Sequence, residues 1–241
     1  MDVNEIVRII PTLKVNNRKL NERFYIETLG MKPLLEESAF ISLGDQTATE
    51  RLILEEAPSM RTRRVEGLKK LARLLIKVED PSEIEALLSQ MKSLPRLFKG
   101  SRGYAFEIVS PEEDVILVHA ENDIRDLVPL ETVPEFYSNT SIKYVSQFEV
   151  SMELRLPEGT ESLLYPEGVA PVITFTKGQG PDLAVENNVT WDLTMLKFLV
   201  KNFDLTSLRQ KFEKTGYFVP KSEKFFLGKD TNNIELWFEE A

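Results

Sequence analysis

One strand–cap–helix plan occurs three times in the chain, at residues 6–30, 71–94 and 194–216. In each copy an apolar stretch of a strand's length leads into a residue type that often caps helices, and a helical apolar stripe follows. The first and third copies end at Gly30 and Gly216, where a left-handed C-terminal residue belongs. Three copies of similar length predict a fold that repeats one small module.

The expected start of each helix follows from local capping chemistry. Asparagine and aspartate accept hydrogen bonds from the free N–H groups of a first helical turn, and proline is tolerated directly after them. The apolar stripes of the helices are expected to include Leu20, Phe24, Ile84, Leu87, Leu88, Met91, Leu205, Leu208 and Phe212. The expected N-caps are Asn16 or Asn17 in the first copy, Asp80 before Pro81 in the second, and Asp204 or Thr206 in the third.

Two short strands around a polar turn are expected after each helix, at 39–56, 104–121 and 224–240. A fourth, degraded unit has an alternating strand at 145–156, at most a short helix at 160–165, and a hairpin with a glycine-rich turn at 171–187. The list of elements therefore predicts four β-α-β-β-β units, paired two and two.

Composition excludes several kinds of chemistry. The 241 residues include no cysteine, which rules out thiol catalysis, disulfides and thiolate metal sites. A net charge of −9 disfavours nucleic acid and anionic membranes as partners, because both attract basic surfaces. No apolar run has the length of a membrane span, and the first residues show no signal peptide. These features predict a cytoplasmic protein.

Short motifs in the repeats resemble the vicinal-oxygen-chelate superfamily, which includes glyoxalase I, the extradiol dioxygenases and the bleomycin-resistance proteins. The carrying residues are Phe24-Tyr25 and Leu29-Gly30 on the first helix, the turn at 110–114, and its counterpart at 230–236. The resemblance implies an α+β fold of tandem βαβββ modules of the glyoxalase-like type, with the second domain more divergent.

The resemblance also suggests a division of the chain into domains. Residues 1–124 would form an N-terminal glyoxalase-like domain of two modules, and residues 141–241 a divergent C-terminal one. Residues 125–140 would link them, because the stretch contains prolines and loses the periodicity. The alternative is one compact domain with this segment packed across it.

Enzymes of this superfamily usually hold a divalent metal with histidine, glutamine or glutamate ligands. The resemblance places Ile10, Arg73 and Leu117 at three ligand positions of the first domain, and Met195 and Glu235 at two positions of the second. We therefore expect no metal, no cofactor, and neither metal-dependent glyoxalase nor dioxygenase activity. Glu235 is either a remnant of the ligand set or an exposed residue on a late strand.

Longer segments resemble the CppA-like proteins of streptococci. They are residues 9–32, 190–198 and 233–240, and the resemblance extends over essentially the full chain. Members of that family are named as proteinases that degrade the third component of human complement. The resemblance therefore implies proteolysis, complement component three as a partner, and a location at the cell surface or outside the cell.

A proteinase needs an activated nucleophile or a metal-activated water. His119 is the only histidine, so a serine triad would have to use it, with Ser101 or Ser110 as neighbours. No nucleophile-elbow motif surrounds either serine. The alternative is a structural histidine. A serine–lysine dyad stays open, because folding can bring such a pair together from any positions.

Three functions follow from these patterns. The first is the complement-degrading proteinase that the resemblance implies. The second is a metal-free binding module, with Arg73, His119 and Glu235 as ligand-binding candidates. Arg73 in place of a metal would suit a small anionic ligand. The third is an interaction protein whose sheets form a homodimer or bind another protein.

Overall fold

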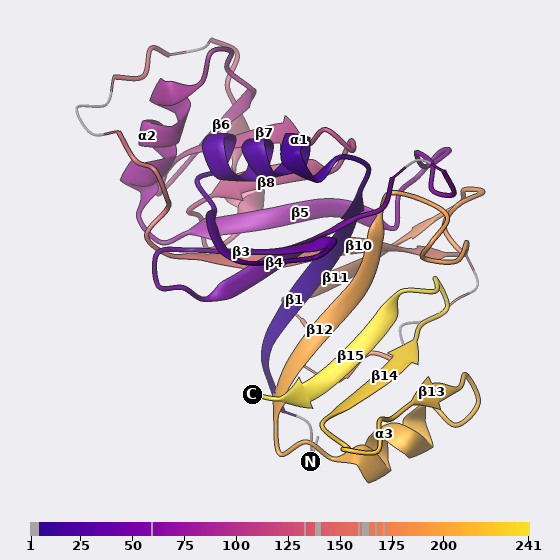
Figure 1. Ribbon diagram of the computed structural model, residues 1–241. Coiled ribbons are helices and arrows are strands. Elements are labelled where there is room, and N and C mark those ends of the chain that lie inside the picture. Colours follow the sequence, from indigo (N-terminus) through magenta and orange to yellow (C-terminus); the bar gives the residue numbers. More distant parts are fainter. Residues whose placement is uncertain are drawn as a thin grey trace.

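The computed structural model describes residues 5–58, 60–132, 134–137, 141–158, 160, 164–166, 168–170 and 172–241. The described strands form one eight-stranded and one seven-stranded sheet (Figure 1). No helix among these residues is long and apolar enough to cross a membrane.

Module one contains β1 (Glu5–Val15), α1 (Arg18–Arg23) with its π-helical continuation (Phe24–Thr28), β2 (Lys32–Glu37), β3 (Phe40–Gly44) and β4 (Glu50–Glu56). Asn17 is the N-cap, because its side chain accepts a hydrogen bond from the N–H of Leu20 at 3.0 Å. The expected buried position of Leu20 is wrong, since this side chain is 52% exposed. Asn21 and Tyr25 occupy the inward side of the helix instead.

Module two contains β5 (Leu71–Val78), α2 (Pro81–Gln90), β6 (Arg96–Gly100), β7 (Gly103–Val109) and β8 (Val115–His119). Its helix starts as predicted, with Asp80 accepting from the N–H of Ser82 at 2.9 Å and Pro81 in the first turn. Ile84, Leu87 and Leu88 are buried against the sheet.

The chain then forms a short 3-10 helix, η2 (Ile124–Asp126), and the edge strand β9 (Val128–Pro129). β9 pairs with β6, so part of the stretch predicted to be a linker belongs to a sheet. The domain division at 125–140 stays a prediction, but the sheets do not follow it, because each contains modules from both halves of the chain.

Module three is reduced to β10 (Phe148–Pro157) and β11 (Ile173–Gly178), which pair in parallel. Residues 161–163 of the expected short helix lie outside the described residues. The expected second strand of the hairpin is wrong, since the chain forms turns between 179 and 189. Pro181 lies in these turns, and Asp182 holds Arg63 through two bonds of 2.6 and 2.8 Å.

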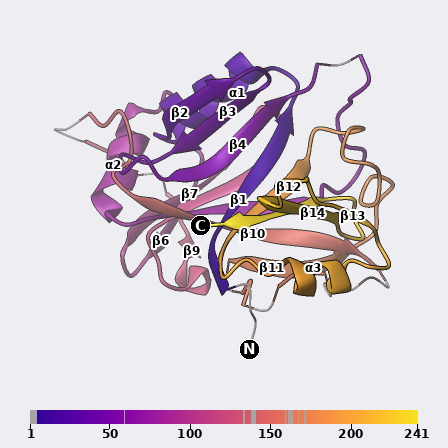
Figure 2. The same ribbon diagram turned by 60° about the horizontal axis from the view of Figure 1, so that its bottom comes forward.

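Module four contains β12 (Leu193–Lys201), α3 (Leu205–Lys211), β13 (Tyr217–Phe218), β14 (Phe225–Lys229) and β15 (Glu235–Glu240). Asp204, one of the two expected caps, accepts from the N–H of Thr206 at 2.9 Å. Leu208 and Phe212 are buried as predicted. α2 and α3 lie at opposite ends of the molecule (Figures 1 and 2).

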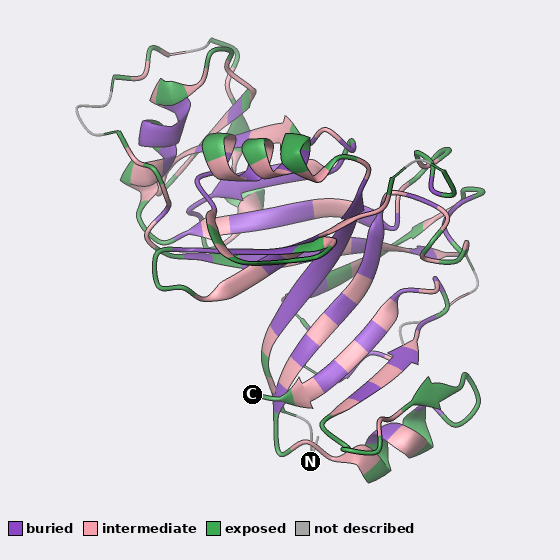
Figure 3. Ribbon diagram, in the orientation of Figure 1, coloured by how far each residue is buried: buried purple, intermediate pink, exposed green. Residues whose placement is uncertain are grey.

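The modules pair one with four and two with three. β1 and β12 join the first pair in the eight-stranded sheet, and β5 and β10 join the second pair in the seven-stranded sheet. One continuous apolar core takes residues from both sheets, including Leu13, Leu54, Leu74 and Val118. The central strands are accordingly the most buried part of the chain, whereas the outer side of α1 is exposed (Figure 3).

A buried carboxylate connects the two sheets where β5 and β12 begin. Asp192 accepts from the backbone N–H groups of Lys70, Leu71 and Leu193 at 2.6, 3.2 and 2.8 Å. Burial raises the pKa of this carboxyl group, and the ammonium of Lys69 opposes that rise. These bonds satisfy three buried donors, so Asp192 fixes the relative position of the two strand starts.

Candidate functional site

The seven-stranded sheet has one face toward the core and one face outward. On β10, alternate residues from Phe148 to Leu154 are buried, whereas Glu149, Ser151 and Glu153 between them point to the other face. This alternation is the ordinary geometry of a strand with one covered face. The outward face therefore carries the polar side chains of β10.

A pocket of about 480 Å³ lies on this face. Strands β5, β8, β10 and β11 form its floor and walls, and residues 121–125 form a lip beside it. The polar side chains that line it from the strands are Lys77, His119, Glu149, Ser151, Glu153 and Thr174. The chain of module three thus completes a pocket that begins in module two, although it lacks the second and third strands of a full module.

His119 ends β8 and is only 5% exposed. Its Nδ1 atom has no hydrogen-bond partner among the described residues. Burial and, next, the positive charge of Lys77 lower the pKa of the imidazole from 6.5 to about 4, although a hydrogen bond with the backbone of Glu121 opposes this shift. The ring is therefore neutral at pH 7, and it can donate one hydrogen bond and accept another.

The lip of the pocket is held by its own hydrogen bonds. Buried Glu121 accepts from the Ser101 hydroxyl at 2.7 Å and from the N–H of Arg102 at 2.5 Å. Asp123 caps η2 and binds the guanidinium of Arg125. Lys77 donates to the side-chain oxygen of Asn122 at 2.9 Å. These contacts connect the lip to the strands that bear the pocket.

Arg73 lies on β5 in the same sheet as His119. Its guanidinium binds Glu153 at 2.7 Å and approaches Glu107 at 3.9 Å. Two carboxylates therefore already compensate the charge that was expected to attract an anionic ligand. Arg73 itself does not line the pocket, but its partner Glu153 does, so Arg73 lies beside the pocket.

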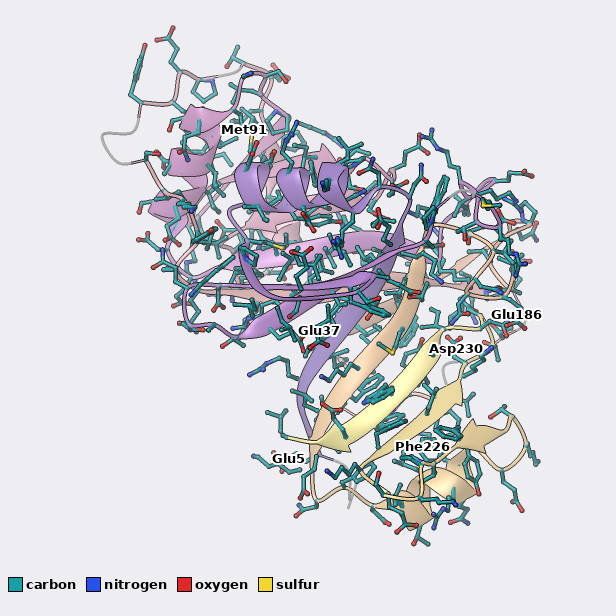
Figure 4. The ribbon with its side chains drawn as sticks, viewed as in Figure 1. Glu5, Glu37, Met91, Glu186, Phe226 and Asp230 are labelled. Carbon is teal, nitrogen blue, oxygen red and sulfur yellow. The ribbon has the colours of Figure 1, made fainter. Side chains whose placement is uncertain are left out.

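Glu235 lies in the other sheet, half-buried at the start of β15 and next to Met195 in the strand register. It is therefore not brought together with Arg73 and His119. A second pocket, of about 150 Å³, lies on that sheet beside Met195 and Glu37 (Figure 4). The turn before β15 is structural, because Asp230 accepts from the Tyr165 hydroxyl at 2.8 Å.

Four of the five side chains at the ligand positions that the resemblance assigns do not fit a divalent metal, and the carboxylate of Glu235 is the exception. Ile10 and Leu117 are buried and apolar, Met195 offers only a thioether, and Arg73 is a cation. The described residues contain no group of three or more histidine, aspartate or glutamate side chains suited to a metal.

Sequence reasoning found His119 but missed Lys77, Ser151 and Thr174. The alternation of apolar and polar residues within 71–78 and 148–157 indicates that Lys77 and Ser151 lie on the uncovered faces of their strands, so it could have identified them. No local signal shows that these two strands are neighbours, since β5 and β10 are far apart in the sequence.

Solved structures of low sequence identity identify the class of fold. A putative dioxygenase from Bacillus subtilis has a TM-score of 0.60 at 12% identity, covering 98% of this chain and 86% of its own. Glyoxalase I from Zea mays has a TM-score of 0.56 at 10% identity, covering 98% and 92%. The chain therefore has the predicted α+β fold of the glyoxalase and dioxygenase superfamily.

Sequence models of protein families identify one family within this class of fold. The model described as CppA N-terminal matches residues 8–130, and the model described as CppA C-terminal matches residues 145–238. The crystal structure of the CppA protein from Streptococcus pneumoniae TIGR4 is 66% identical, covers 99% of this chain and 100% of its own, and has a TM-score of 0.96. The chain belongs to the CppA family. No curated protein sequence matches it.

Proposed function

We propose that this protein binds a small polar molecule, without a metal ion, in the pocket that His119 lines. The observation that carries the proposal concerns His119, which lines the pocket, is 5% exposed, and has no hydrogen-bond partner for its Nδ1 among the described residues. A buried polar atom without a partner costs about 1–3 kcal/mol, so native proteins seldom leave one unsatisfied. Nδ1 is itself buried, so a ligand that binds it must shift the pocket wall locally, and the hydrogen bond would then remove that cost.

The size and lining of the pocket support the same function. Its volume of about 480 Å³ falls within the range of roughly 300–1,000 Å³ that is usual for small-molecule sites. The hydroxyl groups of Ser151 and Thr174 can each donate and accept, and neutral His119 can do both through its two nitrogens. This set suits a ligand with several hydroxyl or carbonyl groups.

Retention of metabolites by the purified protein tests the proposal. Wild type, Ser151→Phe and Ser151→Ala are dialysed against a defined mixture of small polar metabolites, and mass spectrometry identifies the compounds that each retains. Phenylalanine at 151 fills the pocket, whereas alanine leaves it open, so we expect retention by wild type and Ser151→Ala only. Equal retention by both variants, or no retention by wild type, contradicts the proposal.

A second candidate is degradation of complement component three, which family membership supports through the resemblance described above. Within the described residues the two expected serines have other partners: Ser101 donates to Glu121 and Ser110 to Asp114. Lys77 and Ser151 line the same pocket, but Lys77 binds Asn122. A proteolytic site there would need these side chains to rearrange.

Incubation with purified complement component three tests this candidate. If His119 is the general base, wild type cleaves the protein and His119→Ala does not. Equal cleavage by both removes His119 from the mechanism, and cleavage by neither removes proteolysis by the purified chain.

A further inference from the structure

Two arginines lie together beside the His119 pocket. Arg8 on β1 and Arg51 on β4 line a further cavity, of about 290 Å³, to which residues of both sheets contribute. Glu149, Val150 and Val172 line both this cavity and the His119 pocket, so the two spaces adjoin. The two spaces therefore share part of their walls.

Irregularities in strand pairing accompany both arginines. The register between β1 and β12 shifts between Ile6 and Arg8, and the register between β3 and β4 shifts between Leu43 and Gly44, where Arg51 is the extra residue. Such bulges redirect side chains away from the regular alternation of a strand, and they are frequent beside functional sites. Two separate register shifts thus lie at this cavity, with Val7, next to Arg8, as the extra residue on β1 and Arg51 as the extra residue on β4.

The guanidinium of Arg8 has no direct partner among the described residues, although the carboxylates of Asp45 and Glu50 attract it from farther away. No hydrogen bond or ion pair joins its guanidinium to any other described residue. Burial and, next, the positive charge of Arg51 lower the pKa of Arg8. Arg51 binds Asp45 through Nε at 3.1 Å, and its guanidinium carbon lies 6.0 Å from the ring centroid of Phe148, but its terminal nitrogens have no hydrogen-bond partner among the described residues. Two guanidinium groups therefore approach each other with free donors.

The nearby carboxylates are mostly engaged elsewhere. Asp45 also accepts from Thr47 and from the N–H of Phe148, and Glu50 accepts from Ser42 and Lys197. Glu149 is exposed and stands opposite Lys77 in the register of β5 and β10. Each guanidinium has five N–H donors, of which Asp45 uses one on Arg51, so each arginine still has an edge with two donors for an oxyanion.

We propose that Arg8 and Arg51 bind an oxyanion group, carboxylate or phosphate, of the ligand whose uncharged part occupies the His119 pocket. The identity of that ligand as one molecule rests on the function proposed above, whereas the anion site itself does not. The anionic end of the ligand then lies away from Arg73, whose charge is compensated by Glu153 and Glu107.

The test uses inorganic phosphate as the probe, with calorimetry and with NMR of arginine Nε–H and His119 imidazole signals. Four proteins are compared: wild type, Arg8→Gln, Ser151→Phe, and Arg61→Gln as a control at an exposed arginine. We expect saturable binding by wild type, Ser151→Phe and Arg61→Gln, with shifts of the Arg8 and Arg51 signals. Arg8→Gln should bind phosphate at least about tenfold more weakly than wild type, because it loses a charge-assisted contact.

Folding is checked in chloride buffer without phosphate. Arg8→Gln should melt close to wild type, since Arg8 makes no hydrogen bond or ion pair with a described residue, and relief of its repulsion with Arg51 offsets the lost attraction to Asp45 and Glu50. Equal phosphate binding by wild type and Arg8→Gln, or no saturable binding by wild type, overturns the anion site. If Ser151→Phe binds phosphate but wild type retains no metabolite, the binding function proposed for the His119 pocket is rejected and the anion site is kept.

Discussion

The neutral state of His119 makes stability depend on pH in a calculable way. Its pKa is about 4 in the folded protein and about 6.5 when solvated, with burial as the main cause and Lys77 as the second. Between these values the unfolded chain takes up a proton that the folded protein does not. The free energy of unfolding therefore falls as pH decreases from 6.5 to 4, and this contribution is fully present above pH 6.5.

The size of the effect follows from the shift. Each pKa unit corresponds to about 1.4 kcal/mol, so His119 contributes on the order of 3 kcal/mol to the free energy of unfolding. This figure is an upper value, because charged groups nearby also titrate. The assay is urea unfolding of wild type and His119→Gln at several pH values, since glutamine keeps hydrogen-bonding capacity without titrating.

The difference between the two proteins isolates His119 from the carboxylates that titrate in the same range. We expect wild type to lose more stability than His119→Gln below pH 6.5. Because the chain has one histidine, an NMR titration of its imidazole gives the pKa directly. A pKa close to 6.5, or parallel pH profiles for the two proteins, refutes the reasoning.

Three further predictions concern single contacts. Lys77→Gln should raise the pKa of His119 toward 6.5, as measured by the same imidazole titration, and an unchanged pKa would exclude Lys77 as a cause. Asp192→Ala should lower the free energy of urea unfolding by about 3 kcal/mol or more, because three buried N–H groups lose their acceptor, and a loss under about 1 kcal/mol would contradict its connecting role. Gly228→Ala should cost about 1–3 kcal/mol, since a Cβ there would lie 2.4 Å from the ring of Phe212, and thermal unfolding without a lowered midpoint would show that the ring can move.

Local chemistry made much of the fold predictable. Asn17, Asp80 and Asp204 cap their helices through hydrogen bonds to N–H groups two or three residues later, so a short window contains the whole signal. Leu20 shows where such reasoning fails, because the inward position of the helix belongs to Asn21, whose side-chain amide donates to Glu112 of module two at 3.1 Å.

The pairing of modules could not be predicted from local pattern. β1 pairs with β12 and β5 with β10, and nothing within any of these strands identifies its neighbour. The candidate site depends on this pairing, since His119 and Ser151 share a pocket while Glu235 belongs to the other sheet. The partner of Arg73 was likewise hidden, because Glu153 comes from the strand that the pairing places beside it.

The central claim is that a metal-free pocket around His119 binds a small polar molecule. The most direct measurement is the imidazole spectrum of His119 near pH 7, recorded with EDTA, during titration with a metabolite that the protein retains in dialysis. The account predicts a saturable change in the imidazole signals that EDTA does not affect and that Ser151→Phe abolishes. Unchanged imidazole signals, or a change that requires a divalent metal, would contradict it.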